Sequence, residues 1–328
     1  MTTQREIARR AKTSLKTVSR VINRDPLVNA DTRARIEAII AEIGYEPSQA
    51  ARMMRSQRSN VIGFLADGVA TSASSIDLIR GAQDVAWERG KQMMLFNIER
   101  GTHSAAMADS QLAAFRAEAI IYAATFHQRV DLAPTGVPHV LLNCFDTSGQ
   151  SATILPDDYQ LGFDLTEEVI RRGYRRPLFF NLADSVTASH LRARGFEDAA
   201  RAHNLDFSDR VHVAAAPPEE GQVYFLDRLL PQVLAEADRP DIIICGQDLM
   251  AVPLYFLLAE RGLTVGREIA VASFDNLQPI APLLRPGLST MELPYYQMGR
   301  TAMAIAIDGP GADLVQLVRG SFVDRASM

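Results

Sequence analysis

One short segment near the amino terminus carries side chains of the types that read DNA bases. After Ser14, which is a good helix N-cap, apolar residues at helical spacing mark an inner face, and Leu15, Lys16 and Arg20 project from the outer face. Lys and Arg pair with guanine edges, and Leu contacts a thymine methyl group. The pattern predicts that these three side chains read bases in the major groove, with an ordinary solvated helix face as the alternative.

Hydroxyl and amide side chains occur in and around the same segment. Such groups donate hydrogen bonds to phosphate oxygens, which fixes the register of a protein on DNA without reading its sequence. The predicted phosphate contacts are Thr3, Ser14, Thr17, Ser19 and Asn23.

Charge is divided unevenly along the chain. Residues 1–60 contain 12 Lys or Arg against 6 Asp or Glu, whereas residues 61–328 contain 22 against 33. A cationic head on an anionic body is expected where only the head contacts a polyanion such as DNA.

Three short helices would position the side chains of the head. Thr3 with Glu6 matches a capping box and begins a helix that runs to about Arg10. A turn of about three residues separates it from the second helix, which carries the base-reading candidates. A third helix is capped at Asn29 and ends at Gly44. Two helices joined by so brief a turn predict a helix-turn-helix in a small bundle.

Beyond residue 60, short apolar runs alternate with amphipathic stretches, which indicates parallel sheets covered by helices on both faces. About ten strands are expected, and a division near residues 154–160 gives two α/β subdomains. Ligands of such folds bind at the carboxyl ends of the strands, so we expect the ligand site in a cleft between the subdomains. The clearest runs are V-I-G-F-L-A, Q-M-M-L-F-N-I, A-I-I-Y-A-A, H-V-L-L-N-C, P-L-F-F-N-L, V-H-V-A-A, D-I-I-I-C-G and I-A-V-A-S-F.

No catalytic constellation emerges from the residue types. The six histidines are scattered, there is no nucleophile elbow or phosphate-binding glycine loop, and Asp157 and Asp158 are neighbours that would face different directions. Cys144 and Cys245 lie in apolar runs and are expected to be buried free thiols. We therefore expect no enzyme activity, no cofactor and no metal site.

The sequence also bears on location. Its start, M-T-T-Q-R-E, contains no apolar segment that could act as a secretory signal. Apolar runs elsewhere stop short of the roughly 20 residues that a membrane span needs. A cytoplasmic location and no membrane partner are expected.

Several specific strings occur in a fixed order along the chain. The first is I-A-R-R-A-K-T-S-L-K-T-V-S-R-V-I-N, followed by T-R-A-R-I and I-G-Y-E-P-S-Q-A-A-R. Later come R-A-R-G-F at Arg192 to Phe196, G-Q-D-L-M-A at Gly246 to Ala251 and S-F-D-N at Ser273 to Asn276. In this combination they resemble the head, hinge and effector domain of the lactose-repressor and galactose-repressor family of transcriptional regulators.

The resemblance implies a domain organisation. An all-α helix-turn-helix DNA-binding domain over residues 1–47 and a hinge over residues 48–60 would precede an effector-binding and dimerisation domain over residues 61–328. That domain would have the α/β fold of periplasmic binding proteins, with two subdomains built on parallel sheets. They would span about 61–157 and 158–290, followed by a C-terminal crossover.

The resemblance also implies that the hinge becomes helical when two copies lie together in the minor groove. Ala51 and Arg52 match the hinge pattern. Met54 stands where the family usually inserts a leucine between the central base pairs, and Met53 is a weaker substitute. Packing of the Met pair between hinge and core is the alternative.

Carried over residue by residue, the family's effector site falls on Asn143, Arg192, Gln247 and Asp275. A guanidinium, two amides and a carboxylate can form a set of directional hydrogen bonds to the vicinal hydroxyls of a sugar. Asp158 is a further candidate, for which helix capping is an equal alternative.

Two departures from the family pattern bear on the effector. Ser74 and Ser75, which we also expect to contact the effector, stand where relatives often carry paired aromatics, and A-A-A-P-P before Glu219 lacks an expected aromatic. A purine would lose its stacking surfaces, which favours a polar sugar or sugar derivative. Phe126 or Tyr224 could supply a ring, although core packing is the more usual role for such residues.

These expectations combine into one hypothesis. The chain would be a sequence-specific regulator, a repressor of sugar uptake or catabolism genes, that binds near-palindromic operator DNA as a homodimer under allosteric control by a sugar-like effector. A purine or other metabolite acting as corepressor is the alternative within the same fold. A sugar-binding transport receptor and a sugar-converting enzyme are alternatives from other classes. The missing export signal and the basic head argue against the first, and the lack of a base–nucleophile pair against the second.

Overall fold

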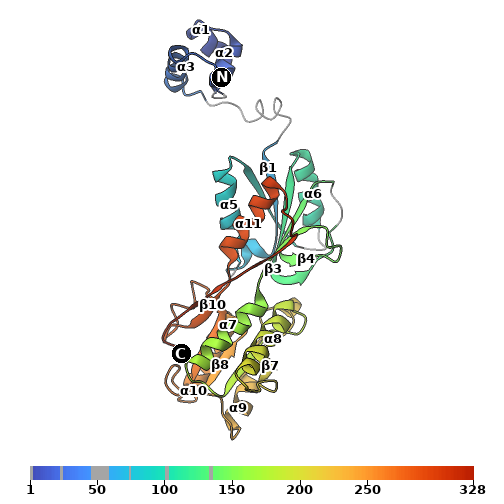
Figure 1. Cartoon of the computed structure of the whole chain (residues 1–328), viewed down its shortest axis with the longest axis vertical. Helices are drawn as coiled ribbons and strands as arrows, with labels where there is room; N and C mark the ends of the chain where they lie inside the picture. Colours follow the sequence, from blue (N-terminus) through green and yellow to red (C-terminus); the bar gives the residue numbers. More distant parts are fainter. Residues whose placement is uncertain (1–2, 23–24, 46–58, 74, 100–102, 133–135) are drawn as a thin grey trace. The chain divides into compact units, whose positions relative to one another are not determined.

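The computed structural model describes residues 3–22, 25–45, 59–73, 75–99, 103–132 and 136–328. They fall into two compact units, Met1–Ser59 and Asn60–Met328, called here the helical unit and the two-lobed unit (Figure 1). Five predicted site residues lie outside the described residues: Asn23, Ala51, Arg52, Met54 and Ser74.

The helical unit contains α1 (Gln4–Arg10), α2 (Leu15–Ile22) and α3 (Ala30–Glu42). The three predicted N-caps are confirmed, because the side chains of Thr3, Ser14 and Asn29 accept hydrogen bonds from the amides of Glu6, Thr17 and Asp31. The small apolar core joins all three helices, as expected for a helix-turn-helix bundle. Its buried members are Ile7, Ala8, Ala11, Val18, Val21 and Ile36.

The first lobe of the two-lobed unit is a parallel sheet in the order β11 (Val315–Val318), β5 (Ala152–Pro156), β4 (His139–Phe145), β3 (Ala119–Arg129), β1 (Val61–Asp67) and β2 (Gln92–Ile98). Successive side chains of a strand face opposite layers. On β1, Ile62 and Phe64 pack with α5 (Ile76–Glu88) and α11 (Tyr295–Asp308), whereas Val61 and Leu65 pack with α6 (His103–Ala114).

The second lobe is a sheet in the order β12 (Ser321–Val323), β10 (Ser289–Glu292), β9 (Ala270–Asp275), β8 (Ile242–Cys245), β6 (Pro177–Asn181) and β7 (Val211–Val213). Only β12 runs antiparallel to its neighbour among these described strands. Helices α7 (Asp158–Arg171) and α8 (Thr187–Ala202) cover one face, and α9 (Leu226–Ala235) and α10 (Asp248–Glu260) cover the other.

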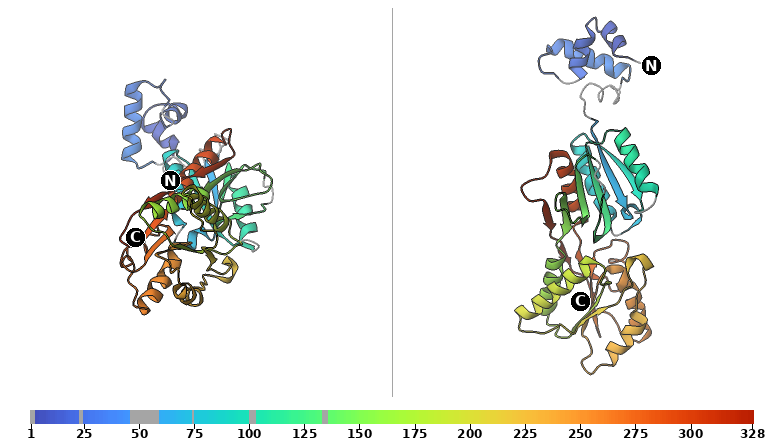
Figure 2. Two further views of the ribbon diagram at one scale, coloured as in Figure 1. Left: turned by 60° about the horizontal axis from the view of Figure 1, so that its bottom comes forward. Right: turned by 90° about the vertical axis from the view of Figure 1, so that its right-hand side faces the viewer.

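The chain passes between the lobes three times (Figure 2). It leaves the first lobe between β5 and α7, returns between β10 and α11, and leaves again between β11 and β12. Because β5 and β10 both end at a crossing, the carboxyl ends of the parallel strands in each sheet face the other lobe. A cleft of this kind is where ligands of open α/β sheets bind.

The predicted architecture is confirmed, and all eight apolar runs are strands. About ten strands were too few, since the described residues contain twelve. The four strands without a predicted run are β5, β10, β11 and β12, which have three to five residues each and lie beside the crossings. Strands so short, with β11 and β12 half exposed, carry little hydrophobic pattern.

Candidate DNA-binding face and effector cleft

Helix α2 presents the predicted base-reading side chains to solvent. Leu15 is 45% exposed, and Lys16 and Arg20 are also exposed, while Val18 and Val21 are buried in the core. Lys16 forms no ion pair with any described residue. Arg20 differs, because its Nε lies 3.0 Å from Oδ2 of Asp25. A base contact by Arg20 would therefore have to compete with that carboxylate.

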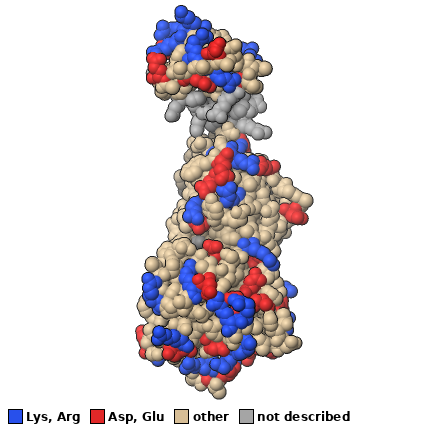
Figure 3. All heavy atoms as spheres, turned by 60° about the vertical axis from the view of Figure 1, so that its left-hand side comes forward, with Lys and Arg blue, Asp and Glu red and all other residues tan. Residues whose placement is uncertain are grey.

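The hydroxyls assigned to phosphate contacts also have local roles. Ser14 Oγ accepts a hydrogen bond from the Thr17 amide at 3.1 Å and lies 2.9 Å from Thr17 Oγ1. Thr3 caps α1 in the same manner, and Ser19 is half buried. Lys and Arg side chains gather over one end of the helical unit in Figure 3. A cationic surface of this kind suits the sequence-independent part of DNA binding.

Two glycines bring α7 and α8 of the second lobe into close contact. A Cβ at Gly162 would collide with the carbonyl oxygen of Arg192, and one at Gly195 with that of Tyr159. The glycine of the R-A-R-G-F string therefore has a packing role, since only a residue without a side chain permits this approach. The consequence is that Arg192 on α8 reaches Asp158 at the start of α7.

Asp158 is the centre of a buried network that joins the lobes. Its Oδ1 accepts a hydrogen bond from Nε of Arg192 at 2.8 Å and forms an ion pair with Nη2 of Arg192 at 2.8 Å, and its Oδ2 lies 2.8 Å from Nδ1 of His127 on β3. Burial alone would raise the pKa of Asp158, but the Arg192 charge and the His127 hydrogen bond outweigh it and lower the pKa. The capping alternative is wrong, because Asp157 caps α7 by accepting from the Gln160 amide.

Arg192 has further partners in the second lobe. Its Nη1 donates to the Gly246 carbonyl oxygen at 2.8 Å, and its guanidinium lies 4.6 Å from the centroid of the Phe274 ring. The side chain is 95% buried. A buried cation with this many fixed contacts is a rigid element of the cleft.

Two more carboxyls lie close to this network. Asp248 is fully buried, and it accepts hydrogen bonds from the Leu277 amide at 2.6 Å and the Thr290 hydroxyl at 2.8 Å. Burial raises the pKa of Asp248 to about 6 in spite of these contacts. The pKa of Asp275 is raised well above its ordinary value by loss of water and by the charge of Asp248, while Arg192 opposes the shift. Neutral Asp275 can donate as well as accept a hydrogen bond.

Two predicted effector residues hold buried polar atoms that have no hydrogen-bond partner in the described structure. They are Oδ1 of Asn143, at the end of β4, and Oγ of Ser75, just before α5. Unpaired buried oxygens are uncommon and call for a partner that the protein itself does not supply. Asn143 also has a positive φ of 58°, and Asp275 one of 123°. Rare backbone conformations of this type cluster at ligand sites.

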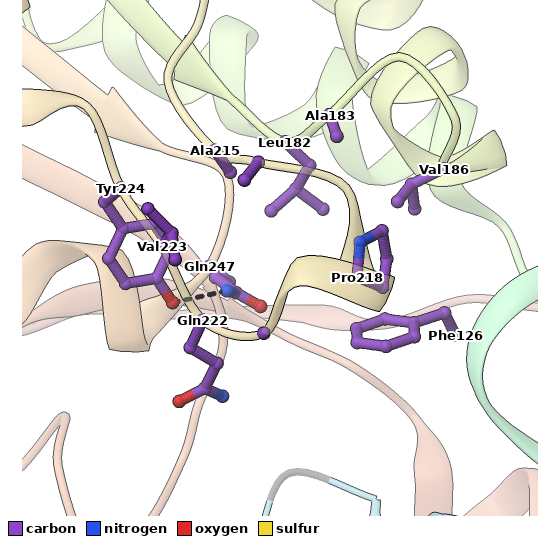
Figure 4. Close-up of a pocket in the computed structure, with 12 residues that line it drawn as sticks. Phe126, Leu182, Ala183, Val186, Ala215, Pro218, Gln222, Val223, Tyr224 and Gln247 are labelled. Atoms are coloured by element: carbon purple, nitrogen blue, oxygen red, sulfur yellow. Dashed lines mark hydrogen bonds between the residues drawn. The ribbon is translucent and has the colours of Figure 1, made fainter.

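A pocket with about 500 Å³ of space, partly open to solvent, lies at the cleft. Gln247 lines it, and its Nε2 donates to the Tyr224 hydroxyl at 2.6 Å (Figure 4). Phe126 of β3 in the first lobe lines it as well. Both rings line the pocket, although Tyr224 also packs against the core of the second lobe. A purine would therefore find aromatic side chains in this pocket.

The structure thus brings the predicted residues into two neighbouring places. Arg192 and Asp275 belong to the charged network around Asp158, and Gln247 belongs to the pocket. Asn143 and Ser75 lie at the cleft end of the first lobe. Sequence reasoning missed His127, because a single histidine in a strand carries no signal of a partner 31 residues away.

Comparison with known proteins agrees with this geometry. The model of bacterial regulatory proteins of the lacI family matches residues 3–48, and that of a periplasmic binding protein-like domain matches residues 166–328. The sucrose operon repressor of Escherichia coli is 32% identical over 94% of this chain and 94% of its own length. The chain belongs to the lacI family.

Other members of the lacI family match at similar length. The ribose operon repressor of Escherichia coli is 30% identical over 94% of this chain and 92% of its own. A LacI-family transcriptional regulator from Rhizobium etli has a TM-score of 0.75 at 27% identity, covering 82% of this chain and 99% of that one. The lac repressor dimer bound to operator and the anti-inducer ONPF has a TM-score of 0.76 at 22% identity, covering 99% and 98%.

Family membership confirms the prediction of a DNA-binding transcriptional regulator that is not an enzyme. In the described residues, no group of three His, Cys, Asp or Glu side chains is placed to hold a metal ion. None of the described helices is long and apolar enough to cross a membrane.

Proposed function

We propose that this regulator represses genes of sugar uptake or catabolism and is controlled by a sugar-like effector bound between its lobes. The observation that carries the proposal is the similarity to the sucrose and ribose operon repressors, which extends over both the helical unit and the cleft. The charged network around Asp158 and the unpaired oxygens of Asn143 and Ser75 support it, because hydroxyl-rich ligands need many directional partners.

The protein would act in the cytoplasm as a homodimer on a near-palindromic operator. One helix-turn-helix reads only a half-site, so useful specificity requires two copies. In this proposal Leu15, Lys16 and Arg20 read bases, and Ala51, Arg52 and Met54 enter the minor groove. The phosphate contacts are Thr3, Ser14, Thr17, Ser19 and Asn23.

Control would work as a population shift between two arrangements of the lobes. His127 on one side and Asp158 on the other already link them, so a ligand that adds contacts across the cleft favours the closed arrangement. Effector and operator then change one another's affinity by the same factor.

A titration of labelled DNA from upstream of the protein's own gene tests the proposal. At modest ionic strength we expect tight binding that is weakened about 5–150-fold by at least one of sucrose, fructose, glucose and ribose. The Lys16→Ala variant serves as the control for specific binding. Operator affinity that no carbohydrate changes would contradict the proposal.

A purine-like corepressor is the second candidate, because Phe126 and Tyr224 line the pocket and offer aromatic surfaces. The HTH-type transcriptional repressor PurR of Pectobacterium carotovorum is 26% identical over 94% of this chain. In the same titration, DNA binding that hypoxanthine or guanine strengthens would favour this candidate.

A further inference from the structure

The pocket lined by Phe126 and Tyr224 differs in chemistry from the charged network beside it. Its walls are mostly aliphatic or aromatic, and no charged side chain is among the described residues that line it. The polar side chains among the lining residues are those of Gln222, Gln247 and Tyr224. A free monosaccharide carries hydroxyls around its whole ring, and burying them against such walls would leave most of them unpaired.

The pocket and the charged network adjoin one another along the chain. Phe126 precedes His127, which holds Asp158, and Gln247 follows Gly246, whose carbonyl oxygen holds Arg192. At two places, therefore, a residue that lines the pocket is the chain neighbour of a residue that holds the network. A ligand long enough to occupy both would meet hydroxyl-binding groups at one end and rings at the other.

Two aromatic rings frame the pocket from opposite sides (Figure 4). Tyr224 comes from the second lobe, and Phe126 is the first lobe's contribution to the described lining. Aromatic faces bind the apolar C–H faces of a sugar ring or another ring.

The polar edge of the pocket offers one hydrogen-bond donor and one acceptor. Gln247 donates to the Tyr224 oxygen, which leaves the Tyr224 proton and the Gln247 amide oxygen available for a further partner. Burial raises the pKa of Tyr224 to about 12, so the phenol keeps this proton at neutral pH. One donor beside one acceptor matches a single hydroxyl group.

We propose that the effector is a disaccharide or an aryl glycoside rather than a free monosaccharide. One sugar unit contacts the charged network of Asp158, Arg192 and Asp275. The second ring lies between Phe126 and Tyr224. This inference rests on the proposed control by a sugar. It also assigns a role in effector specificity to Phe126 and Tyr224, which would contact the effector from opposite sides.

Calorimetric titration of the full-length protein tests the inference. The probes are sucrose, cellobiose and phenyl β-D-glucoside, each compared with glucose and fructose. We expect at least one two-ring probe to bind about tenfold or more tightly than either monosaccharide. Equal affinity for one-ring and two-ring probes would overturn the inference.

Variants of the two rings sharpen the test. Phe126→Ala and Tyr224→Ala should weaken the best two-ring probe about tenfold or more while changing monosaccharide affinity by less than about twofold. Tyr224→Phe, which keeps the ring, should lose only the part due to the hydroxyl and guards against misfolding of the alanine variant. The matched control is Phe115→Ala, because Phe115 is 44% exposed just before β3, at the end of that strand opposite to Phe126.

Failure of this inference differs from failure of the proposed function. Monosaccharides that bind, release operator DNA and ignore the ring variants would overturn the inference and leave the sugar-controlled repressor standing. Absence of any carbohydrate effect on both binding and operator release would overturn both.

Discussion

In the helical unit, the proposed base-reading side chains Leu15, Lys16 and Arg20 are exposed to solvent, and the polar side-chain contacts of Ser14 and Arg20 are made with residues three to five positions away. Ser14 pairs with Thr17, and Arg20 with Asp25. In the two-lobed unit, by contrast, the functional groups are buried and their partners lie 31 to 54 residues away, as for His127 and for Arg192. Substitution of a functional residue should therefore change binding but not stability in the helical unit, and should change stability as well in the two-lobed unit.

The largest test of this contrast is Arg192→Ala. It leaves the carboxylate of Asp158 buried without its cation, which should cost about 3–5 kcal/mol of unfolding free energy. Urea unfolding followed by circular dichroism measures the loss. Arg194→Ala is the control on the same helix, since that side chain is 73% exposed and should change stability by less than about 0.5 kcal/mol. An equal loss of unfolding free energy in the two variants would contradict the proposed difference between the two units.

A second test uses pH and Asp248. Burial raises the folded-state pKa of Asp248 from 3.8 to about 6, so the folded protein keeps a proton that the unfolded chain releases. Its contribution to stability is complete below about pH 4 and is lost as pH rises through 6, with a total of about 3 kcal/mol. The raised pKa of Asp275 acts in the same direction.

Asp248→Asn should remove most of this loss, because an amide can still pair with the Leu277 amide and the Thr290 hydroxyl. Urea midpoints between pH 4.5 and 7 give the comparison. Asp209→Asn is the control, since its side chain is 85% exposed. If the urea midpoints of wild type and Asp248→Asn changed equally with pH, this buried carboxyl would not cause the pH dependence of stability.

The smallest expected effect on folding comes from Lys16→Ala. Loss of a base contact should weaken operator binding by about 1–3 kcal/mol while leaving sugar affinity unchanged and unfolding free energy within about 0.5 kcal/mol. Arg35→Ala, an exposed cation on α3, controls for the general loss of charge. If Lys16→Ala weakened binding to random DNA equally, Lys16 would contact phosphates rather than bases.

The same contrast explains which features could be predicted from sequence. Caps such as Thr3 and Asn29 depend on residues two or three positions away, so local patterns identified the helices of the head correctly. The apolar runs likewise identified the long strands. The short strands beside the crossings could not be found, because their pairing depends on the tertiary fold.

The cleft shows the same limit at the level of single residues. The family strings placed Arg192, Gln247 and Asp275 near one another, but the pairing of Asp158 with His127 depends on how two lobes meet. The pocket role of Tyr224 arises from a loop that brings it to Gln247, 23 residues later in the sequence. No periodicity encodes such contacts.

The measurement that tests the account most directly is sugar affinity with and without saturating operator DNA. Reciprocal coupling requires that operator lower the affinity for the active sugar by the same factor by which that sugar lowers the affinity for operator, about 5–150-fold. Calorimetry and fluorescence anisotropy on the same full-length preparation supply the two factors. Agreement is the predicted result, and sugar binding that is indifferent to saturating operator would contradict control of the DNA-binding unit by the cleft.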